Sequence, residues 1–374
     1  MTDQTPIRTA HLDPQGNLLD EDERVRRLMR LKIHHPQAEY VVGKVAIFRR
    51  MAKHALEGIS LAVPGRSGSG KSRLIARLRR DILKETADAA GLVASETGIA
   101  TPDGDWRPVL FVPTPANVRI MTLASAILTA LGDENPEYGV EGEKTARVRR
   151  KLQEQKVRII LFDEFQHLVE GRTDNFGFKA GDWLKSILNE ADGSVPVPIE
   201  QRTGYFVHAV FFGRPSITTL FAQNGQFCRR NRGVAHLKAF DWIDEAERAK
   251  FQMTLRGIDQ ALPFPEWSGL ADDAFALDIH RATDGVIGRI MPLLQGAGME
   301  ALVAGSPRIS QQLASDTFDF LEVAKGTDDF EPRENPWRMK QKMPGDPVGP
   351  PPDLSRKTRM KGKPRKNDPD FRKA

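Results

Sequence analysis

The sequence predicts an α/β protein in which a parallel sheet carries helices on both faces and a small all-α domain follows. Short apolar runs recur up to about Trp242, and helical patterns lie between them. Strands that alternate with helices are typical of a parallel sheet covered on both faces. A glycine-rich loop directly follows the first apolar run, and beyond Trp242 only helical patterns continue. These three observations predict the fold class.

The N-terminal region, residues 1–35, is predicted to be an arm followed by a charged helix. Residues 1–20 are polar and contain Pro14 and Gly16, so we expect a loosely held arm. The charged helix is predicted from Glu21 to Lys32 and ends before Pro36, because a residue that precedes proline disfavours the helical conformation.

The central region, residues 36–242, carries the predicted sheet. A helix is predicted from Lys44 to Leu56, and the apolar run at 59–63 that follows Gly58 reads as a buried strand. Further strands are predicted at 109–112, 157–162 and 205–212, with helices at 72–83, 117–131 and 182–191.

The region after Trp242 is predicted to form a helical domain, residues 243–326, and a tail, residues 327–374. Pro292 should kink or break the third helix of this domain. The tail is rich in proline and lacks apolar periodicity, so we expect it to be disordered in isolation. The four helices are predicted at 244–258, 272–283, 287–303 and 311–324.

Composition excludes several classes of protein. From Glu331 to the end, 13 Lys or Arg face six Asp or Glu, so this stretch is +7 and residues 1–330 of the +5 chain are −2. A near-neutral body argues against a uniformly basic nucleic-acid binder. No apolar stretch approaches the ~18 residues of a membrane span, the start does not resemble a secretory signal, and the single Cys228 permits no internal disulfide. We therefore expect a cytoplasmic protein without membrane contact.

The segment from Gly65 to Ser72 reads GRSGSGKS and matches the pattern G-x-x-x-x-G-K-[ST]. Glycines let the backbone curl so that successive N–H groups face one anion, and the next helix directs its positive end at the same point. Lys71 is predicted to reach the β- and γ-phosphates of ATP, and the Ser72 hydroxyl to bind Mg²⁺. The predicted nucleotide-binding residues of this loop are Gly65, Ser67, Gly68, Ser69, Gly70, Lys71 and Ser72.

A second site element is predicted where the apolar run at 157–162 ends in Asp163 and Glu164. Asp163 is predicted to hold Mg²⁺ directly or through water, and Glu164 to polarise the attacking water as a general base. Hydrolysis of ATP is the main prediction, and binding without turnover is the alternative.

Four strings point to a known family. FDEFQHL at 162–168 matches the DE-x-QHL-like stretch of that family. FGRP at 212–215, QFCRR at 226–230 and DGVIGR at 284–289 correspond to its strand ending in GTP, its R-R/F segment and the GxIG that opens its lid. Over about residues 25–325 the sequence resembles the TniB/TnsC-type AAA+ transposition regulators, relatives of the phage MuB protein. The resemblance implies a P-loop AAA+ ATPase core with a helical lid.

The resemblance also implies roles for individual residues. Arg214 stands where a polar sensor near the γ-phosphate is expected, although the family usually has threonine there. Arg229 or Arg230 would act as a finger that completes the ATP site of a neighbouring subunit, and Arg289 would contact phosphate from its own chain. A solvated surface role is the alternative for Arg229, Arg230 and Arg289. Val42 is expected to line the adenine pocket.

With this resemblance, the sequence predicts an ATP-dependent DNA-binding homo-oligomer, a ring or a helical filament, that selects target DNA and recruits or activates a transposase. A target-selection protein is a further expected partner. Basic clusters at 24–32, 147–151 and 356–373 are candidate contacts to double-stranded DNA, and solvated helix faces are the alternative. No recognition-helix motif is evident, so contact with DNA should be largely sequence-independent.

Two other functions remain open from the sequence. One is an AAA+ motor that remodels proteins or loads clamps, and the other is a nucleotide-gated binding adaptor with negligible turnover. The tail could dock on the transposase or bind DNA. Residues 327–374 carry no apolar pattern of a winged helix, which argues against an origin initiator.

Overall fold

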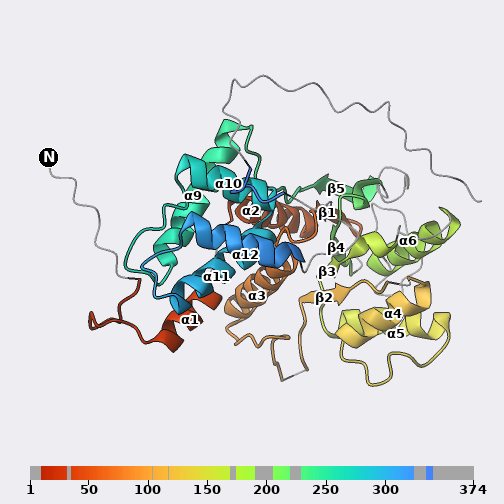
Figure 1. Cartoon of the computed structure of the whole chain (residues 1–374). Helices are drawn as coiled ribbons and strands as arrows, with labels where there is room; N and C mark the ends of the chain where they lie inside the picture. The colour runs from red at the N-terminus through yellow and green to blue at the C-terminus, as the bar shows by residue number, and fades with distance from the viewer. Residues whose placement is uncertain are drawn as a thin grey trace, which may run out of the picture. The chain divides into compact units, whose positions relative to one another are not determined.

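The computed structural model describes residues 10–31, 35–102, 104–116, 118–168, 174–189, 205–219, 229–323 and 334–339. The chain divides into two compact units, Met1–Trp337 and Arg338–Ala374. All elements named below belong to the first unit (Figure 1).

A five-stranded parallel sheet forms the centre of this unit. Its strand order is β2-β3-β4-β1-β5, and every pairing is parallel. The prediction of a parallel α/β sheet is confirmed. The strands are β1 (Ser60–Pro64), β2 (Val109–Pro113), β3 (Ile159–Asp163), β4 (His208–Gly213) and β5 (Asn231–Val234).

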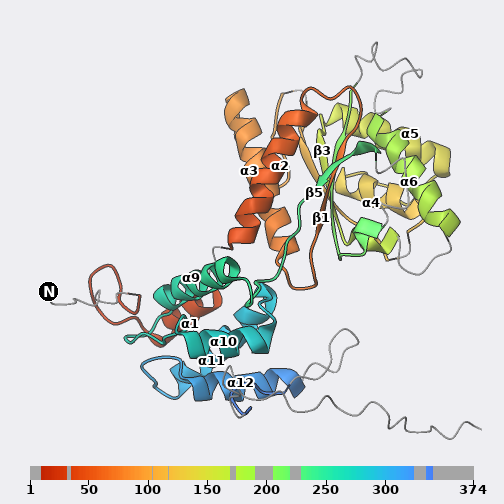
Figure 2. The ribbon, with the colours of Figure 1, turned by 90° about the horizontal axis from the view of Figure 1, so that it is seen from above.

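Helices cover both faces of the sheet (Figure 2). Successive residues of a strand point to opposite faces, so Phe211 packs into the core under one set of helices and Phe212 into the core under the other. The Phe212 side is covered by α2 (Pro36–Ala52) and α3 (Lys71–Ala90), and the Phe211 side by α4 (Ile120–Ala130), α5 (Glu141–Glu154) and α6 (Asp174–Asn189).

Helix α2 begins at Pro36, earlier than the predicted start at Lys44. Proline suits the first helical position because its missing N–H would have no partner there. The ring of His35 accepts a hydrogen bond from the backbone N–H of Gln37 at 3.2 Å and caps the helix. The segment 40–43, which contains Val42, is therefore helical.

A helical group contains α9 (Glu245–Ala261), α10 (Asp273–Thr283), α11 (Ile287–Val303) and α12 (Gln311–Val323). The N-terminal helix α1 (Glu21–Met29) joins it, because Leu28 is buried in the same apolar cluster as Phe251 and Leu294. The predicted all-α region after the sheet is confirmed, and its core also includes α1.

The break predicted at Pro292 does not occur, because α11 continues from Ile287 to Val303. A proline inside a helix costs about 3 kcal/mol. Ile290, Leu294 and Ala297 are fully buried on this helix, and such packing outweighs a local cost of that size.

Residues 334–337, at the end of the first unit, pack on α12. The Asn335 amide donates to the Ser315 carbonyl at 3.0 Å and to the Asp319 carboxylate at 2.8 Å, and the Trp337 ring lies edge-on to Phe318. The first unit therefore extends to Trp337, beyond the predicted domain end at residue 326. The basic tail cluster at 356–373 lies outside the described residues.

Candidate nucleotide site

The glycine-rich loop lies at the carboxyl edge of the sheet, between β1 and α3. Gly68 and Gly70 have φ values of +75° and +89°, which glycine adopts without strain. A Cβ on Gly65 would stand 2.5 Å from the Ser69 hydroxyl and 3.1 Å from the Leu237 carbonyl, so the loop is tightly packed at this position. The N-terminus of α3 follows directly, and a helix N-terminus favours an anion.

Lys71 is buried within this loop. Its Nζ donates to the carbonyls of Gly65 and Arg66 at 2.9 and 3.0 Å. Burial lowers the pKa of Lys71, and the negative charges of Glu164 and Asp163 oppose that shift. The ammonium is thus held at the mouth of the phosphate loop beside two acids.

Ser72 and Asp163 meet across the site. The Ser72 hydroxyl donates to Oδ2 of Asp163 at 3.3 Å, which joins the start of α3 to the end of β3. Burial raises the pKa of Asp163. A hydroxyl and a carboxylate are oxygen ligands of the kind that Mg²⁺ prefers, so the donor set fits this cation.

Two further hydroxyls at this edge are buried and make no hydrogen bond within the described part of the chain, those of Ser69 and Thr114. Ser69 belongs to the phosphate loop, and the Thr114 N–H donates to the Asp163 carbonyl at 3.0 Å. Buried hydroxyls usually have partners. Their position here fits a ligand that carries several acceptor oxygens.

Gln166 connects two predicted site residues. Its amide nitrogen donates to the Glu164 carboxylate, and its amide oxygen accepts from the Arg214 N–H at 3.0 Å. Gln166 is only 1% exposed, and Glu164 has a φ of +52°, a strained value for a residue with a Cβ. The predictions gave no role to Gln166, although it lies in the family-like string at 162–168.

The lid touches the phosphate loop through two glycines. The Gly288 N–H donates to the Gly68 carbonyl at 2.8 Å, and a Cβ on Gly288 would stand 2.4 Å from that oxygen. Arg289 comes next in the chain, and its guanidinium pairs with Asp284 at 3.2 Å. The first turn of α11 is thus held against the loop that is expected to bind phosphate.

The other predicted residues lie elsewhere. Arg229 and Arg230 directly precede β5, whose Asn231 pairs with Ser60, so both stand at the amino edge of the sheet. Arg230 pairs with Glu57 at 3.3 Å, whereas Arg229 is exposed. Val42 lies on α2, half-buried against the cluster on the Phe212 side of the sheet.

The cluster at 147–151 makes contacts within its own domain. The Arg147 guanidinium donates to the Tyr138 carbonyl at 2.9 Å, Lys151 pairs with Asp133 at 3.5 Å, and Arg150 pairs with Glu154 at 3.6 Å.

In the cluster on α1, the Arg24 guanidinium donates to the Pro263 carbonyl at 3.1 Å, and Arg26 pairs with Glu23 at 2.8 Å. Several arginines of both clusters therefore make hydrogen bonds or ion pairs within the folded chain.

Over the described residues, no group of three or more His, Cys, Asp or Glu side chains is arranged to hold a metal ion. Over the same residues, no single helix combines the length and apolarity that a membrane span requires. Only α10 and α11 together meet that test, as a pair bent by 116°.

The sheet, the phosphate loop and the helical lid define an AAA+ fold. The same fold occurs in an Aeropyrum pernix ORC2 protein solved with ADPNP and ADP, at a TM-score of 0.53 and 14% identity over 79% of this chain and 71% of that chain. Pyrobaculum aerophilum Cdc6p gives a TM-score of 0.55 and 13% identity over 83% and 75% of the two chains. Drosophila ORC bound to DNA gives a TM-score of 0.50 and 13% identity over 84% and 72%.

The family comparison is more specific than the fold. The model of the family "Bacterial TniB protein" matches residues 30–197, which include the phosphate loop and the Asp163–Glu164 pair. No curated protein matches this sequence. The resemblance to TniB-type AAA+ proteins is thus confirmed over these residues.

Proposed function

We propose that this protein is an ATP-dependent, DNA-binding oligomeric regulator that selects target DNA and recruits or activates a transposase. The observation that carries the proposal is the joining of the phosphate loop to the acidic end of β3, through Ser72 and Asp163, within a TniB-type sequence. DNA binding is supported by the general likeness to the fold of ORC bound to DNA.

In this proposal the loop N–H groups and Lys71 bind the phosphates of ATP. Ser72 and Asp163 would hold Mg²⁺, which neutralises charge on the phosphates when bound. Glu164 orients and polarises the attacking water, and Gln166 positions Glu164 against the loop that carries Arg214. Arg289, beside the contact between Gly288 and Gly68, senses the phosphates from the lid.

Assembly would follow from the position of Arg229. Its exposure at the amino edge, away from the phosphate loop of its own chain, supports a role on a neighbouring subunit. A planar guanidinium suits the charge of a transferring phosphoryl group. ATP bound between subunits then favours a ring or filament on DNA, and hydrolysis favours release.

Transposase recruitment rests on the family match, and the tail is the proposed docking segment for the transposase. A target-selection protein would be a second partner. Contact with duplex DNA would be largely sequence-independent, because phosphate contacts made by each subunit add across an assembly.

The proposal is tested by measuring oligomer size by mass photometry and DNA affinity by fluorescence anisotropy, with and without a nonhydrolysable ATP analogue. We expect the analogue to enlarge the oligomer and to tighten binding to duplexes of unrelated sequence. If the analogue changes neither quantity, the proposal fails. A remodelling motor would instead show hydrolysis stimulated by a protein substrate and not by duplex DNA.

A further inference from the structure

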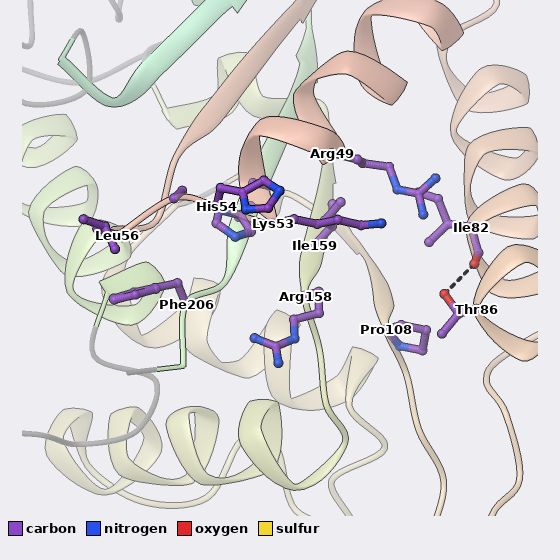
Figure 3. A pocket seen from close by; sticks show the side chains of 13 residues that line it. Arg49, Lys53, His54, Leu56, Ile82, Thr86, Pro108, Arg158, Ile159 and Phe206 are labelled. Carbon is purple, nitrogen blue, oxygen red and sulfur yellow. Dashed lines mark hydrogen bonds between the residues drawn. The ribbon is translucent and has the colours of Figure 1, made fainter. Parts of the chain in front are cut away.

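A cavity of about 570 Å³ lies at the amino edge of the sheet, opposite the phosphate loop. It opens where β3 and β4 begin, at Ile159 and His208, and it is bounded by the C-terminal end of α2 and by α3 (Figure 3). Its volume falls within the ~300–1,000 Å³ of ordinary ligand pockets.

The cavity is rich in positive charge. Arg49 on α2, Lys53 directly after α2 and Arg158 before β3 line it, and none of the described residues that line it is acidic (Figure 3). Arg49 pairs with the exposed Glu85 at 2.6 Å, whereas Lys53 and Arg158 have no acidic partner among the described residues.

Arg158 is held by an aromatic ring instead of an acid. Its guanidinium lies 4.3 Å from the centre of the Tyr205 ring, and the Tyr205 hydroxyl donates to the Val157 carbonyl. Stacking of this kind orients a guanidinium and leaves its N–H groups available to an anion.

His208 adds a neutral donor. Burial lowers the pKa of His208 to about 4, so the ring is uncharged at neutral pH. Its Nδ1 accepts from the Ile59 N–H at 3.3 Å, which leaves the proton of the neutral ring on Nε2.

The rest of the lining is apolar. Ala52, Ile82, Ile159 and Phe206 are each exposed by 9% or less and are contributed by separate segments. An apolar floor beneath unpaired cations fits a ligand that places a carboxylate beside a bulky apolar group. The phosphate backbone of duplex DNA is convex and has no apolar group to fill such a floor.

We propose that this amino-edge cavity is a docking site for an acidic segment of a partner protein, one that inserts an apolar side chain between Ile82, Ile159 and Phe206 while its carboxylates pair with Lys53 and Arg158. The site shares no residue with the phosphate loop. Peptide docking by the single chain therefore does not require the phosphate loop to bind nucleotide.

The test uses a phage-displayed library of random twelve-residue peptides, selected on the full-length protein. The enriched peptide is then labelled with fluorescein and its affinity is measured by anisotropy. We expect enriched sequences to combine Asp or Glu with Phe, Leu or Trp. The double variant Lys53→Gln/Arg158→Gln should bind the labelled peptide at least tenfold more weakly than wild type does.

Arg50→Gln is the matched control, because Arg50 is exposed on the same helix but does not line the cavity. It should change the affinity by less than twofold, and Lys71→Ala should leave peptide binding intact even if all nucleotide function is lost. Unchanged melting temperatures would show that the variants are folded.

Four results would overturn the proposal: no enrichment, enrichment of neutral or basic peptides, equal loss of affinity in Arg50→Gln, and a loss of affinity for duplex DNA in the double variant as large as its loss for the peptide.

Discussion

The two edges of the sheet use charge in opposite ways. At the carboxyl edge, Lys71 lies beside Asp163 and Glu164. Burial lowers the pKa of Lys71 and raises the pKa of Asp163, so it favours the neutral form of each side chain. At the amino edge, Lys53 and Arg158 stand at a cavity whose described lining contains no acid. The same strands connect both edges, since β3 begins beside Arg158 and ends at Asp163.

This difference shows what each edge is suited to bind. The carboxyl edge combines a lysine, two acids and curled backbone N–H groups, and we propose that it binds a phosphate chain with its cation. The amino edge offers cations over an apolar floor, and we propose that it binds an organic anion. Arg229 also stands at the amino edge, so in the proposed oligomer one edge of each chain would complete the other edge of its neighbour.

The largest expected effect comes from Arg229→Ala, which should lower ATP hydrolysis by about 10³-fold, the lower end of the range for arginine fingers. Mixing this variant with Lys71→Ala should restore about a quarter of the wild-type rate, because a quarter of the interfaces between subunits then combine an intact lysine with an intact arginine. The readout is phosphate release. If the mixture shows no more activity than its two components, Arg229 does not act on a neighbour.

His208 predicts a pH dependence of stability that belongs to the amino edge. Its folded pKa of about 4 lies below the ordinary value of 6.5, so the unfolded chain takes up the proton first. The contribution of His208 to the free energy of unfolding is fully present above pH 6.5 and is lost as the pH falls toward 4. The loss between pH 7.5 and pH 5 should be about 2 kcal/mol.

The measurement for His208 is urea unfolding at both pH values, compared with His208→Asn, which keeps an acceptor for the Ile59 N–H but cannot titrate. The variant should show a smaller loss than wild type by about the same 2 kcal/mol. Equal losses in the two proteins would contradict the assignment.

Gly288→Ala should weaken nucleotide binding about tenfold, because its methyl would push the lid away from the Gly68 carbonyl. Isothermal titration with ADP measures the effect. Gly257→Ala is the matched control within the lid, since a Cβ there meets nothing within 4 Å, and it should stabilise α9 by about 0.5–1 kcal/mol. Equal ADP affinity in wild type and Gly288→Ala would exclude a role for this contact in binding.

The smallest expected effect is at Gln166. Gln166→Met removes both hydrogen bonds at similar volume and should lower kcat about fivefold with little change in KM, since the lost contact positions Glu164 and does not bind substrate. Steady-state ATP hydrolysis separates the two constants. A change in KM alone would mean that Gln166 supports nucleotide binding instead.

The sequence indicated which residues lie together at the carboxyl edge, because a short motif contains most of them. The pattern from Gly65 to Ser72 dictates a turn, and the apolar run that ends in Asp163 can be recognised as a strand from its local sequence alone. The edge strand Asn231–Val234 has no apolar run and was missed for that reason. The contact of Gly288 with Gly68 depends on how the lid packs, which local patterns do not encode.

The amino-edge cavity was beyond sequence reasoning for a related reason. Its lining comes from separate segments, on α2, on α3 and at the starts of β3 and β4, and none of them carries a motif. The basic cluster at 147–151 shows the opposite case. It is conspicuous in the sequence, but its side chains are largely bound to nearby side chains and carbonyls.

The central claim, that ATP hydrolysis at the carboxyl edge releases this protein from DNA, is tested most directly by the lifetime of the complex of Glu164→Gln with duplex DNA in ATP and Mg²⁺. Stopped-flow anisotropy after addition of excess unlabelled duplex measures that lifetime. The account predicts that wild type dissociates as it hydrolyses ATP, whereas Glu164→Gln stays bound at least tenfold longer, as wild type does with a nonhydrolysable analogue. Equal lifetimes for wild type and Glu164→Gln in ATP would contradict it and favour an adaptor that binds nucleotide without using turnover.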